Sequence, residues 1–89
     1  MSDQSEPRIQ FPCDYPIKVV GASAPDFCAM AVAVMSRHAE LAGAEPVTER
    51  RSRNGRYTAV TITIVATGES QLRAIFAELK ATGRVDMVL

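Results

Sequence analysis

The stretch that most constrains the fold is residues 56–67, because no other part of the chain is so rich in β-branched residues over so long an unbroken run. Val60, Ile62 and Ile64 fall on one face of this stretch, while Thr61 and Thr63 fall on the other. That period of two is typical of a half-buried strand. The apolar face of such a strand needs a cover, and helical patterns before and after it can provide one.

Two amphipathic helices are predicted on either side of this strand. Ser23-Ala-Pro-Asp26 has the layout of a helix start, with a capping hydroxyl, a proline in the first turn and an acid facing the positive end of the dipole. An apolar stripe then continues to Leu41, and Gly43 is predicted to end the helix. The second helix follows a capping region at 67–68 and ends at Gly83. Its stripe consists of Leu72, Ile75, Phe76 and Leu79.

Three further strands are predicted at 17–22, 45–52 and 84–89. The strand at 45–52 contains a proline and several charges, which suit the edge of a sheet. Asn54-Gly55 favours a type I′ turn, which would pair Val47 with Ile62 and Thr48 with Thr61. In the last strand, alternation places Val85, Met87 and Leu89 on one side and Asp86 and Val88 on the other. We expect Lys18 and Asp86 on the open face of neighbouring strands.

The element order is therefore β-α-β-β-α-β, the order of the ferredoxin-like α+β fold: a four-stranded antiparallel sheet with two helices on one face. The strand at 56–67 lies centrally beside the first strand. Residues 1–10 are predicted to be a disordered tail, and 11–89 a single domain, because 89 residues suffice for one core only.

Charge and hydropathy limit the classes of partner. Ten basic and ten acidic residues cancel, so the general positive footprint of nucleic-acid or anionic-membrane binders is missing. The longest apolar run, 27–35, is half of what a membrane span requires. The first eight residues lack the apolar core of a signal peptide. Cys13 and Cys28 form no disulfide framework, and we expect structural thiols in a reducing, cytoplasmic setting.

No arrangement of side chains in the sequence indicates a catalytic site, a metal site or a cofactor. His38 is the one histidine, and it lies near the end of an apolar helix stripe, where a structural role is expected. The two cysteines lack metal-ligand spacing. The chain is therefore predicted not to be an enzyme.

The strongest local charge feature is a group of arginines, which we call the arginine hairpin: Arg50, Arg51, Arg53 and Arg56. Only Glu49 opposes them, so they could bind a phosphate, a carboxylate or an acidic partner surface. The alternative is a solvated hairpin whose charges prevent edge pairing. RNA recognition is disfavoured, because the outward positions of the central strands carry no aromatic stacking platform.

Two other surfaces could bind a ligand or partner. The turn Gly21, Ala22, Ser23 and Ala24 combines a glycine that permits close approach with a helix N-terminus that favours carboxylates. In the alternative interpretation, the glycine only lets the chain turn and the serine only caps the helix. The open sheet face is apolar enough to indicate a homodimer contact or a partner surface. Its predicted members are Val20, Ala59, Thr61, Thr63, Val65 and Val88. The alternative is the mixed face that ordinary antiparallel sheets expose to water.

Three stretches, 15–21, 54–67 and 86–89, resemble the YbeD-like family of small bacterial proteins of unknown function (UPF0250/DUF493 type). The resemblance implies a fold similar to ACT-type regulatory domains, a cytoplasmic location and allosteric regulation touching lipoate or amino-acid metabolism. It brings no catalytic residues. The sequence thus predicts a non-enzymatic regulatory module that binds a small carboxylate or a metabolic enzyme. The alternative is a protein-interaction or nucleic-acid-binding module that uses the arginine hairpin.

Overall fold

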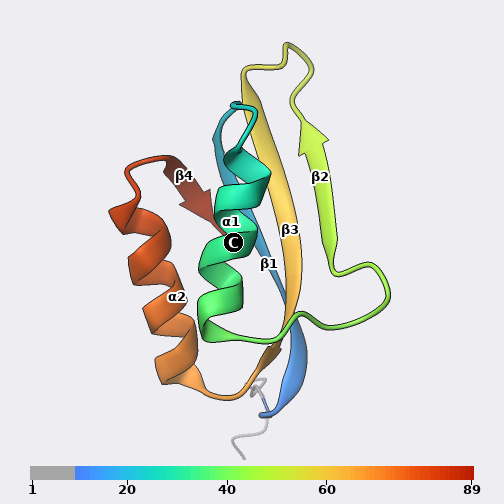
Figure 1. The fold of residues 1–89 in the computed structure, drawn as a ribbon, viewed down its shortest axis with the longest axis vertical. Helices are drawn as coiled ribbons and strands as arrows, with labels where there is room; N and C mark the ends of the chain where they lie inside the picture. Colours follow the sequence, from blue (N-terminus) through green and yellow to red (C-terminus); the bar gives the residue numbers. More distant parts are fainter. Residues whose placement is uncertain (1–9) are drawn as a thin grey trace, which may run out of the picture.

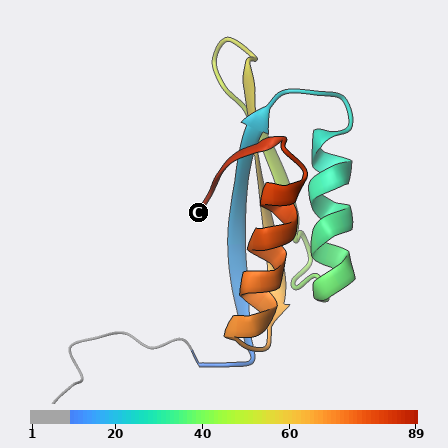
Figure 2. The same cartoon turned by 90° about the vertical axis from the view of Figure 1, so that its left-hand side faces the viewer.

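Six elements build one antiparallel sheet with two helices packed on a single face (Figures 1 and 2). The computed structural model describes residues 10–89, so the predicted tail at 1–10 lies outside the described residues except for Gln10. The strand order is β2-β3-β1-β4. This arrangement confirms the predicted ferredoxin-like fold. The elements are β1 (Cys13–Ala22), α1 (Phe27–His38), β2 (Val47–Arg51), β3 (Tyr57–Ala66), α2 (Glu69–Ala81) and β4 (Val85–Val88).

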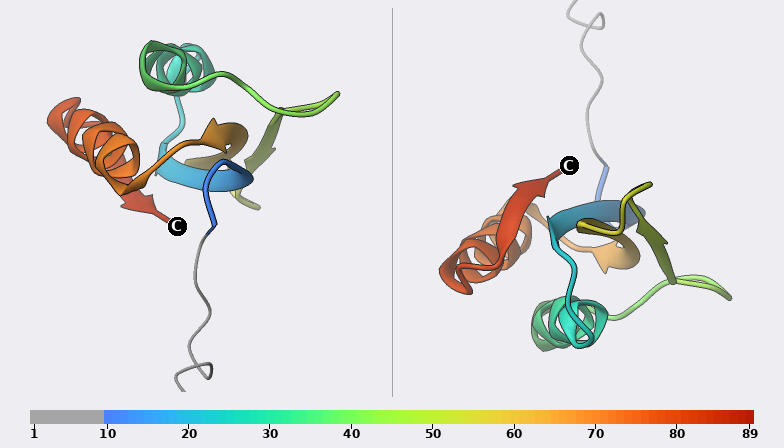
Figure 3. Two further views of the ribbon diagram at one scale, coloured as in Figure 1. Left: turned by 90° about the horizontal axis from the view of Figure 1, so that it is seen from below. Right: turned by 90° about the horizontal axis from the view of Figure 1, so that it is seen from above.

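The central strand β3 supplies the middle of the core, as its pattern predicts. Val60, Ile62 and Ile64 are fully buried beneath the helices. Strand β3 pairs with β1 along its whole length, from Cys13 opposite Ala66 to Ala22 opposite Tyr57. Viewed along the strands, the two helices lie on the same side of the sheet and leave its other face uncovered (Figure 3).

Strand β1 begins at Cys13, four residues before the predicted start, because the ten-residue β3 offers a pairing partner over that length. On its other side, β1 pairs with the short β4 only from Lys18 onward, where Lys18 exchanges backbone hydrogen bonds of 3.0 and 2.8 Å with Leu89. Pro16 is two residues before Lys18, so its backbone nitrogen points to the same edge of β1, beyond the end of the pairing with β4. A missing N–H there costs no ladder hydrogen bond.

Helix α1 begins later than predicted. Its N-cap is Asp26, and no side chain caps it. The Ser23 hydroxyl, predicted to be the cap, lies 2.7 Å from the Thr58 hydroxyl on β3 instead. The prediction was wrong because a buried strand residue offered this serine a tertiary partner, which a local capping pattern cannot reveal.

Helix α1 also ends earlier, at His38, and Ala39 is already extended. The chain then continues the ladder beside β3: Val65 N donates to Glu40 O at 2.8 Å, and Ala42 N donates to Thr63 O at 2.9 Å. Gly43 therefore does not end the helix. Pairing with the uncovered edge of β3 replaces one further helical turn.

Strand β2 lies at the sheet edge with the predicted register, Val47 opposite Ile62 and Thr48 opposite Thr61. The turn is not type I′, because Gly55 has φ +76° while Asn54 does not have a positive φ. Instead, Gly55 N donates to Ser52 O at 2.9 Å. The Asn54 side chain accepts the Arg56 N–H at 2.9 Å, a local bond that asparagine commonly makes in turns.

Strand β4 pairs with β1 as predicted, but its alternation was predicted wrongly. Val20 is opposite Met87 while Gly21 is opposite Val85, so Asp86 is the extra residue of a β-bulge. Val85 and Val88 consequently pack against the core, while Met87 and Leu89 are exposed. Lys18 and Asp86 are both exposed on the neighbouring strands β1 and β4, and the residue paired with Lys18 is Leu89.

Within residues 10–89, no helix is both long enough and apolar enough to cross a membrane.

Candidate binding site

The two surfaces that the sequence predicts separately, the turn at 21–24 and the arginine hairpin, meet at one end of the sheet. Both lie at the upper end of the molecule in Figure 1. Ser23 N donates a 2.9 Å hydrogen bond to Arg56 O, and Ala22 is opposite Tyr57 in the β1–β3 ladder. We call this region the hairpin end.

Within the turn, Gly21 has a packing role. A Cβ atom at this position would lie 2.2 Å from Arg84 O and 2.6 Å from Cε1 of Phe27. Arg84 O and the Phe27 ring therefore occupy the space beside Gly21 where the sequence predicts a ligand. Ala22 is exposed and Ala24 is half-buried, and Ala24 O accepts the Phe27 N–H at 3.1 Å.

The four arginines of the hairpin end are all exposed, and none of them forms an ion pair within the part of the chain that the structure describes. Arg50 is opposite Ala59 on the open sheet face, and Arg51 is opposite Thr58, whose hydroxyl contacts Ser23. Of the two arginines on β2, Arg51 is the nearer to the turn, because Thr58 is also opposite Gly21. Arg53 and Arg56 belong to the connection between β2 and β3.

Polar contacts within the connection hold its shape. The Ser52 hydroxyl donates to Asn54 Oδ1 at 3.0 Å and accepts the Tyr57 N–H at 3.0 Å. With the Asn54–Arg56 bond, these contacts fix the backbone that carries the arginines. Guanidinium groups on an ordered backbone are better placed for anion recognition than groups on a mobile loop.

Two shallow hollows flank Tyr57 on the open sheet face, and Val20 lines both. The first, about 160 Å³, also borders Arg50 and Arg51. The second, about 380 Å³, borders Asp86 and Met87. The sequence did not single out Tyr57, Asp86 or Met87 for a site. The bulge that brings Met87 to this face leaves no signal in the residue pattern.

An ion pair closes the hairpin end on the helix side. The Arg84 guanidinium contacts both carboxylate oxygens of Asp26, at 2.7 and 3.1 Å. These hydrogen bonds hold the pKa of the Asp26 carboxyl below its usual range, and Asp26 in turn raises the pKa of Arg84. Asp26 at the start of α1 thus remains a carboxylate, and the positive charge of Arg84 compensates its charge, which reduces its repulsion of an anion near that helix end.

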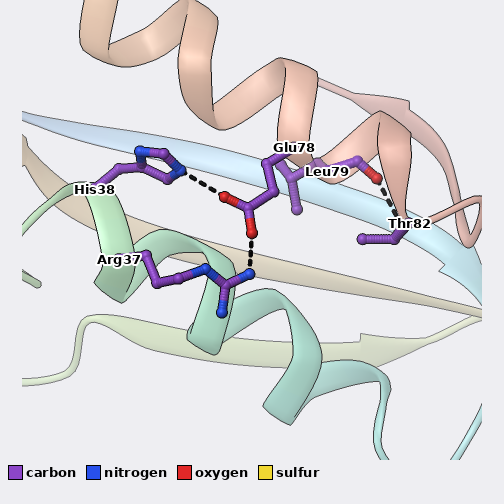
Figure 4. A network of polar contacts seen from close by, with 5 residues as sticks. All are labelled: Arg37, His38, Glu78, Leu79 and Thr82. Carbon is purple, nitrogen blue, oxygen red and sulfur yellow. Dashed lines mark hydrogen bonds and ion pairs between the residues drawn. The ribbon is translucent and has the colours of Figure 1, made fainter.

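A second polar cluster joins the helices far from the hairpin end (Figure 4). Arg37 and His38, in the last turn of α1, both contact Glu78 of α2, with His38 Nε2 2.6 Å from Glu78 Oε1. The hydrogen bonds from Arg37 and then His38 hold the pKa of the Glu78 carboxyl below its usual range. Gln71 Nε2 donates to His38 O at 3.0 Å. His38 thus has the structural contacts that its position predicts.

The cysteines and acidic residues do not gather into a metal site. Within residues 10–89, no group of three or more histidine, cysteine, aspartate or glutamate side chains could hold a metal ion. Cys13 and Cys28 are free and half-buried. Burial raises the pKa of the Cys28 thiol, and the negative charge of Glu49 adds to that effect, so its reactive thiolate form is disfavoured.

The sheet, its strand order and its two helices define a small domain with the ferredoxin-like fold. Solved structures show the same fold. The solution structure of protein HP0495 from H. pylori matches with a TM-score of 0.69 and 18% identity, over 100% of this chain and 93% of that one. The crystal structure of the ACT domain from GTP pyrophosphokinase of Chlorobium tepidum matches with a TM-score of 0.66 and 15% identity, over 86% and 97%.

Sequence comparison identifies the family. Residues 6–89 match the model described as "Protein of unknown function (DUF493)", and the chain belongs to this family. It is 47% identical to a UPF0250 protein of Azotobacter vinelandii, over 99% of this chain and 97% of that protein. It is 40% identical to a UPF0250 protein of Hahella chejuensis, with the same coverage. The resemblance seen in the sequence is confirmed.

Proposed function

We propose that this chain is a non-enzymatic, cytoplasmic regulatory module that binds a small carboxylate at the hairpin end. The observation that carries the proposal is the bonded contact of the turn with the hairpin, through Ser23 N and Arg56 O at 2.9 Å. It places exposed arginines without described ion pairs beside the N-terminus of α1. Both features favour an anion.

A small carboxylate fits this end better than an extended phosphate polymer. The chain has no net charge, and the outward residues of β1 and β3 beside Tyr57 are small or aliphatic, so bases would find no further aromatic ring to stack on. The hollows of about 160 and 380 Å³ are of small-molecule size. The carboxylates that we propose are lipoate, related acyl carboxylates or amino acids, with allosteric regulation of their metabolism as the role.

The fold supports a regulatory role by analogy, because the Chlorobium domain of the same fold is an ACT domain within a larger enzyme. The cytoplasmic location rests on Cys13 and Cys28, which are free thiols as expected in a reducing compartment. A non-enzymatic role is consistent with the titratable groups of the hairpin end, because Asp26 and Arg84 bind each other.

A thermal-shift and calorimetric screen of lipoate, octanoate and single amino acids tests the proposal. We expect at least one carboxylate to stabilise the protein. Arg51→Gln should reduce the affinity for that carboxylate roughly ten- to a hundredfold, since a hydrogen bond to a charged group is worth about 1.5–3 kcal/mol. Arg73→Gln is the matched control, because Arg73 is exposed on α2. A screen without any binder, or equal weakening by both variants, would contradict the proposal.

A second candidate function, binding of nucleic acid or an acidic protein by the arginine hairpin, is favoured by the four exposed arginines alone. Salt separates the two candidates. For binding to a phosphate backbone, the logarithm of the association constant falls steeply and linearly with the logarithm of the salt concentration. Carboxylate binding between the turn and the hairpin should weaken far less. Titration of single-stranded RNA and of the best carboxylate across a salt series therefore decides between them.

A further inference from the structure

The open sheet face of this molecule has no cover in the described chain (Figure 2). Its outward positions on β3, and Val20 and Ala22 on β1, are half-buried or exposed, and apart from Tyr57 they are small or aliphatic; Asp14 and Lys18 of β1 add two exposed charges. Met87, Leu89 and Tyr57 share this face, with exposed fractions of 50%, 67% and 45%. Large exposed apolar side chains that share one face mark an interaction surface. The face therefore needs an occupant, and the charges at its borders indicate which one.

One row of residues crosses the whole sheet at the hairpin end. Arg50 is opposite Ala59, Ala59 is opposite Val20, and Val20 is opposite Met87. Arg50 therefore lies at one border of the face, and Met87, with the bulged Asp86 next to it, lies at the other. Asp86 lines the hollow beside Val20 and Tyr57 on this face, and it also lines a hollow beside Lys80 of α2, so it lies at the border between the two faces.

From this row we propose that the open sheet face binds a second copy of the chain, face to face, with a two-fold axis parallel to the strands between β1 and β3. This rotation places β2 of one protomer over β4 of the other, and it keeps the hairpin ends of the two protomers together. It therefore places Arg50 of each protomer over Met87 of the other, next to the bulged Asp86. Because an isologous interface repeats every contact, the attraction between Arg50 of one protomer and Asp86 of the other occurs twice.

The next row supports the same axis. Thr48 is opposite Thr61, Thr61 is opposite Lys18, and Lys18 bonds to Leu89. With the axis parallel to the strands, Lys18 lies over Thr61 of the other protomer. A two-fold axis perpendicular to the strands through this row would place Lys18 over its own copy, and opposed like charges are unfavourable. Small and aliphatic side chains also suit two aligned sheets about 10 Å apart.

The size of the face sets the strength of the contact. With strands about 4.8 Å apart, β1 and β3 each about 33 Å long, and β2 and β4 about 16 and 13 Å long, the face covers roughly 450 Å². A standard interface buries about 800 Å² per partner. We therefore expect a weak dimer that forms only at high protein concentration. This proposal is argued without the bound carboxylate, but the dimer contact covers Val20, Arg50 and Asp86, which also line the hollows beside Tyr57. Arg51 and the turn are the part of the carboxylate site that the dimer contact does not use.

Sedimentation equilibrium of the full chain from about 10 μM to about 1 mM tests the proposal, since small interfaces give weak complexes. We expect a reversible monomer–dimer equilibrium. Arg50→Glu and Asp86→Arg should each weaken it roughly tenfold or more, and the double variant should return it to within about threefold of the wild type. Thr63→Asp, on the same face of β3, should abolish the dimer. Arg73→Glu, on α2, is the control and should leave it unchanged.

Circular dichroism and thermal melts at low concentration establish that each variant folds. A protein that remains monomeric over the whole range overturns the proposal and leaves the face to a different partner. A dimer that Thr63→Asp does not weaken uses another surface, which also overturns it. A dimer that Thr63→Asp abolishes but the charge reversals do not change contradicts the proposed axis.

Discussion

The Phe27 ring packs so closely against the α-carbon of Gly21 that no side chain fits there. A Cβ atom would lie 2.6 Å from Cε1 of the ring, and 2.2 Å from Arg84 O on the other side. Helix α1 and the start of β4 thus meet over a single residue of β1. The glycine is required for packing between elements, and any ligand at the hairpin end must bind beside it.

We expect Gly21→Ala to destabilise the protein by about 3 kcal/mol, because overpacking costs 1–3 kcal/mol and the nearest atom here is a backbone oxygen that cannot rotate away. Urea denaturation measures this loss. Gly68→Ala is the matched control, since a Cβ at Gly68 would meet nothing within 4 Å. It should cost less than about 1 kcal/mol. Equal losses for the two variants would contradict the close packing at Gly21.

A second prediction concerns the two faces of β3. Ile62 is fully buried and Thr61 is half-buried on the open face. Ile62→Ala should therefore destabilise the protein by about 2–5 kcal/mol, as expected when a large core side chain is truncated. Thr61→Ala should change the unfolding free energy of the monomer by about 0.5 kcal/mol or less. Similar denaturation midpoints for both variants would mean that the faces are reversed.

The pH dependence of stability tests the Glu78 cluster. Because Arg37 and His38 lower the pKa of Glu78 in the folded state, this carboxylate stabilises the protein above its unfolded pKa, near 4.5. The contribution is lost as the pH falls through the lower folded value. Glu78→Gln should therefore reduce the melting temperature at pH 7, and its difference from the wild type should shrink below pH 4.5.

The control for this experiment is Glu45→Gln, because Glu45 is exposed and forms no ion pair within residues 10–89. Its melting temperature should follow the wild type across the same pH range. A Glu78→Gln deficit that stays constant down to pH 2–3 would show that the cluster acts through packing and not through the charge of Glu78.

The order of elements, the edge position of β2 and its register with β3 were predictable because they depend on local patterns. Alternating β-branched residues identified β3, and the short connection after β2 limited the pairing to Val47 opposite Ile62. The buried residues Leu72, Ile75 and Leu79 of α2 followed from their helical spacing. Each of these features is encoded within a few consecutive residues.

The features that were mispredicted depend on partners distant in sequence. Ser23 has the pattern of a cap, but Thr58, 35 residues away, takes its hydroxyl. The chain leaves α1 at His38 because β3 offers a free edge to residues 40–42. The bulge at Asp86 follows from the way β4 meets Gly21. The sequence therefore predicts the candidate site as two separate surfaces. The register of β1 against β3, with Ala22 opposite Tyr57, brings them together.

The last prediction concerns the link between these two surfaces. Thr58 is 2% exposed, and its hydroxyl contacts the Ser23 hydroxyl at 2.7 Å, so the pair ties the turn to β3 at the hairpin end. We expect a double-mutant cycle of Ser23→Ala and Thr58→Val to give a coupling free energy of about 1 kcal/mol in urea denaturation, the typical net value of one hydrogen bond. Thr61→Val, on the open face of the same strand, should show no coupling with Ser23→Ala. Additive losses for Ser23 and Thr58 would mean that the two hydroxyls do not interact in solution, and the turn would then be held at the hairpin end by the Ser23–Arg56 backbone bond alone.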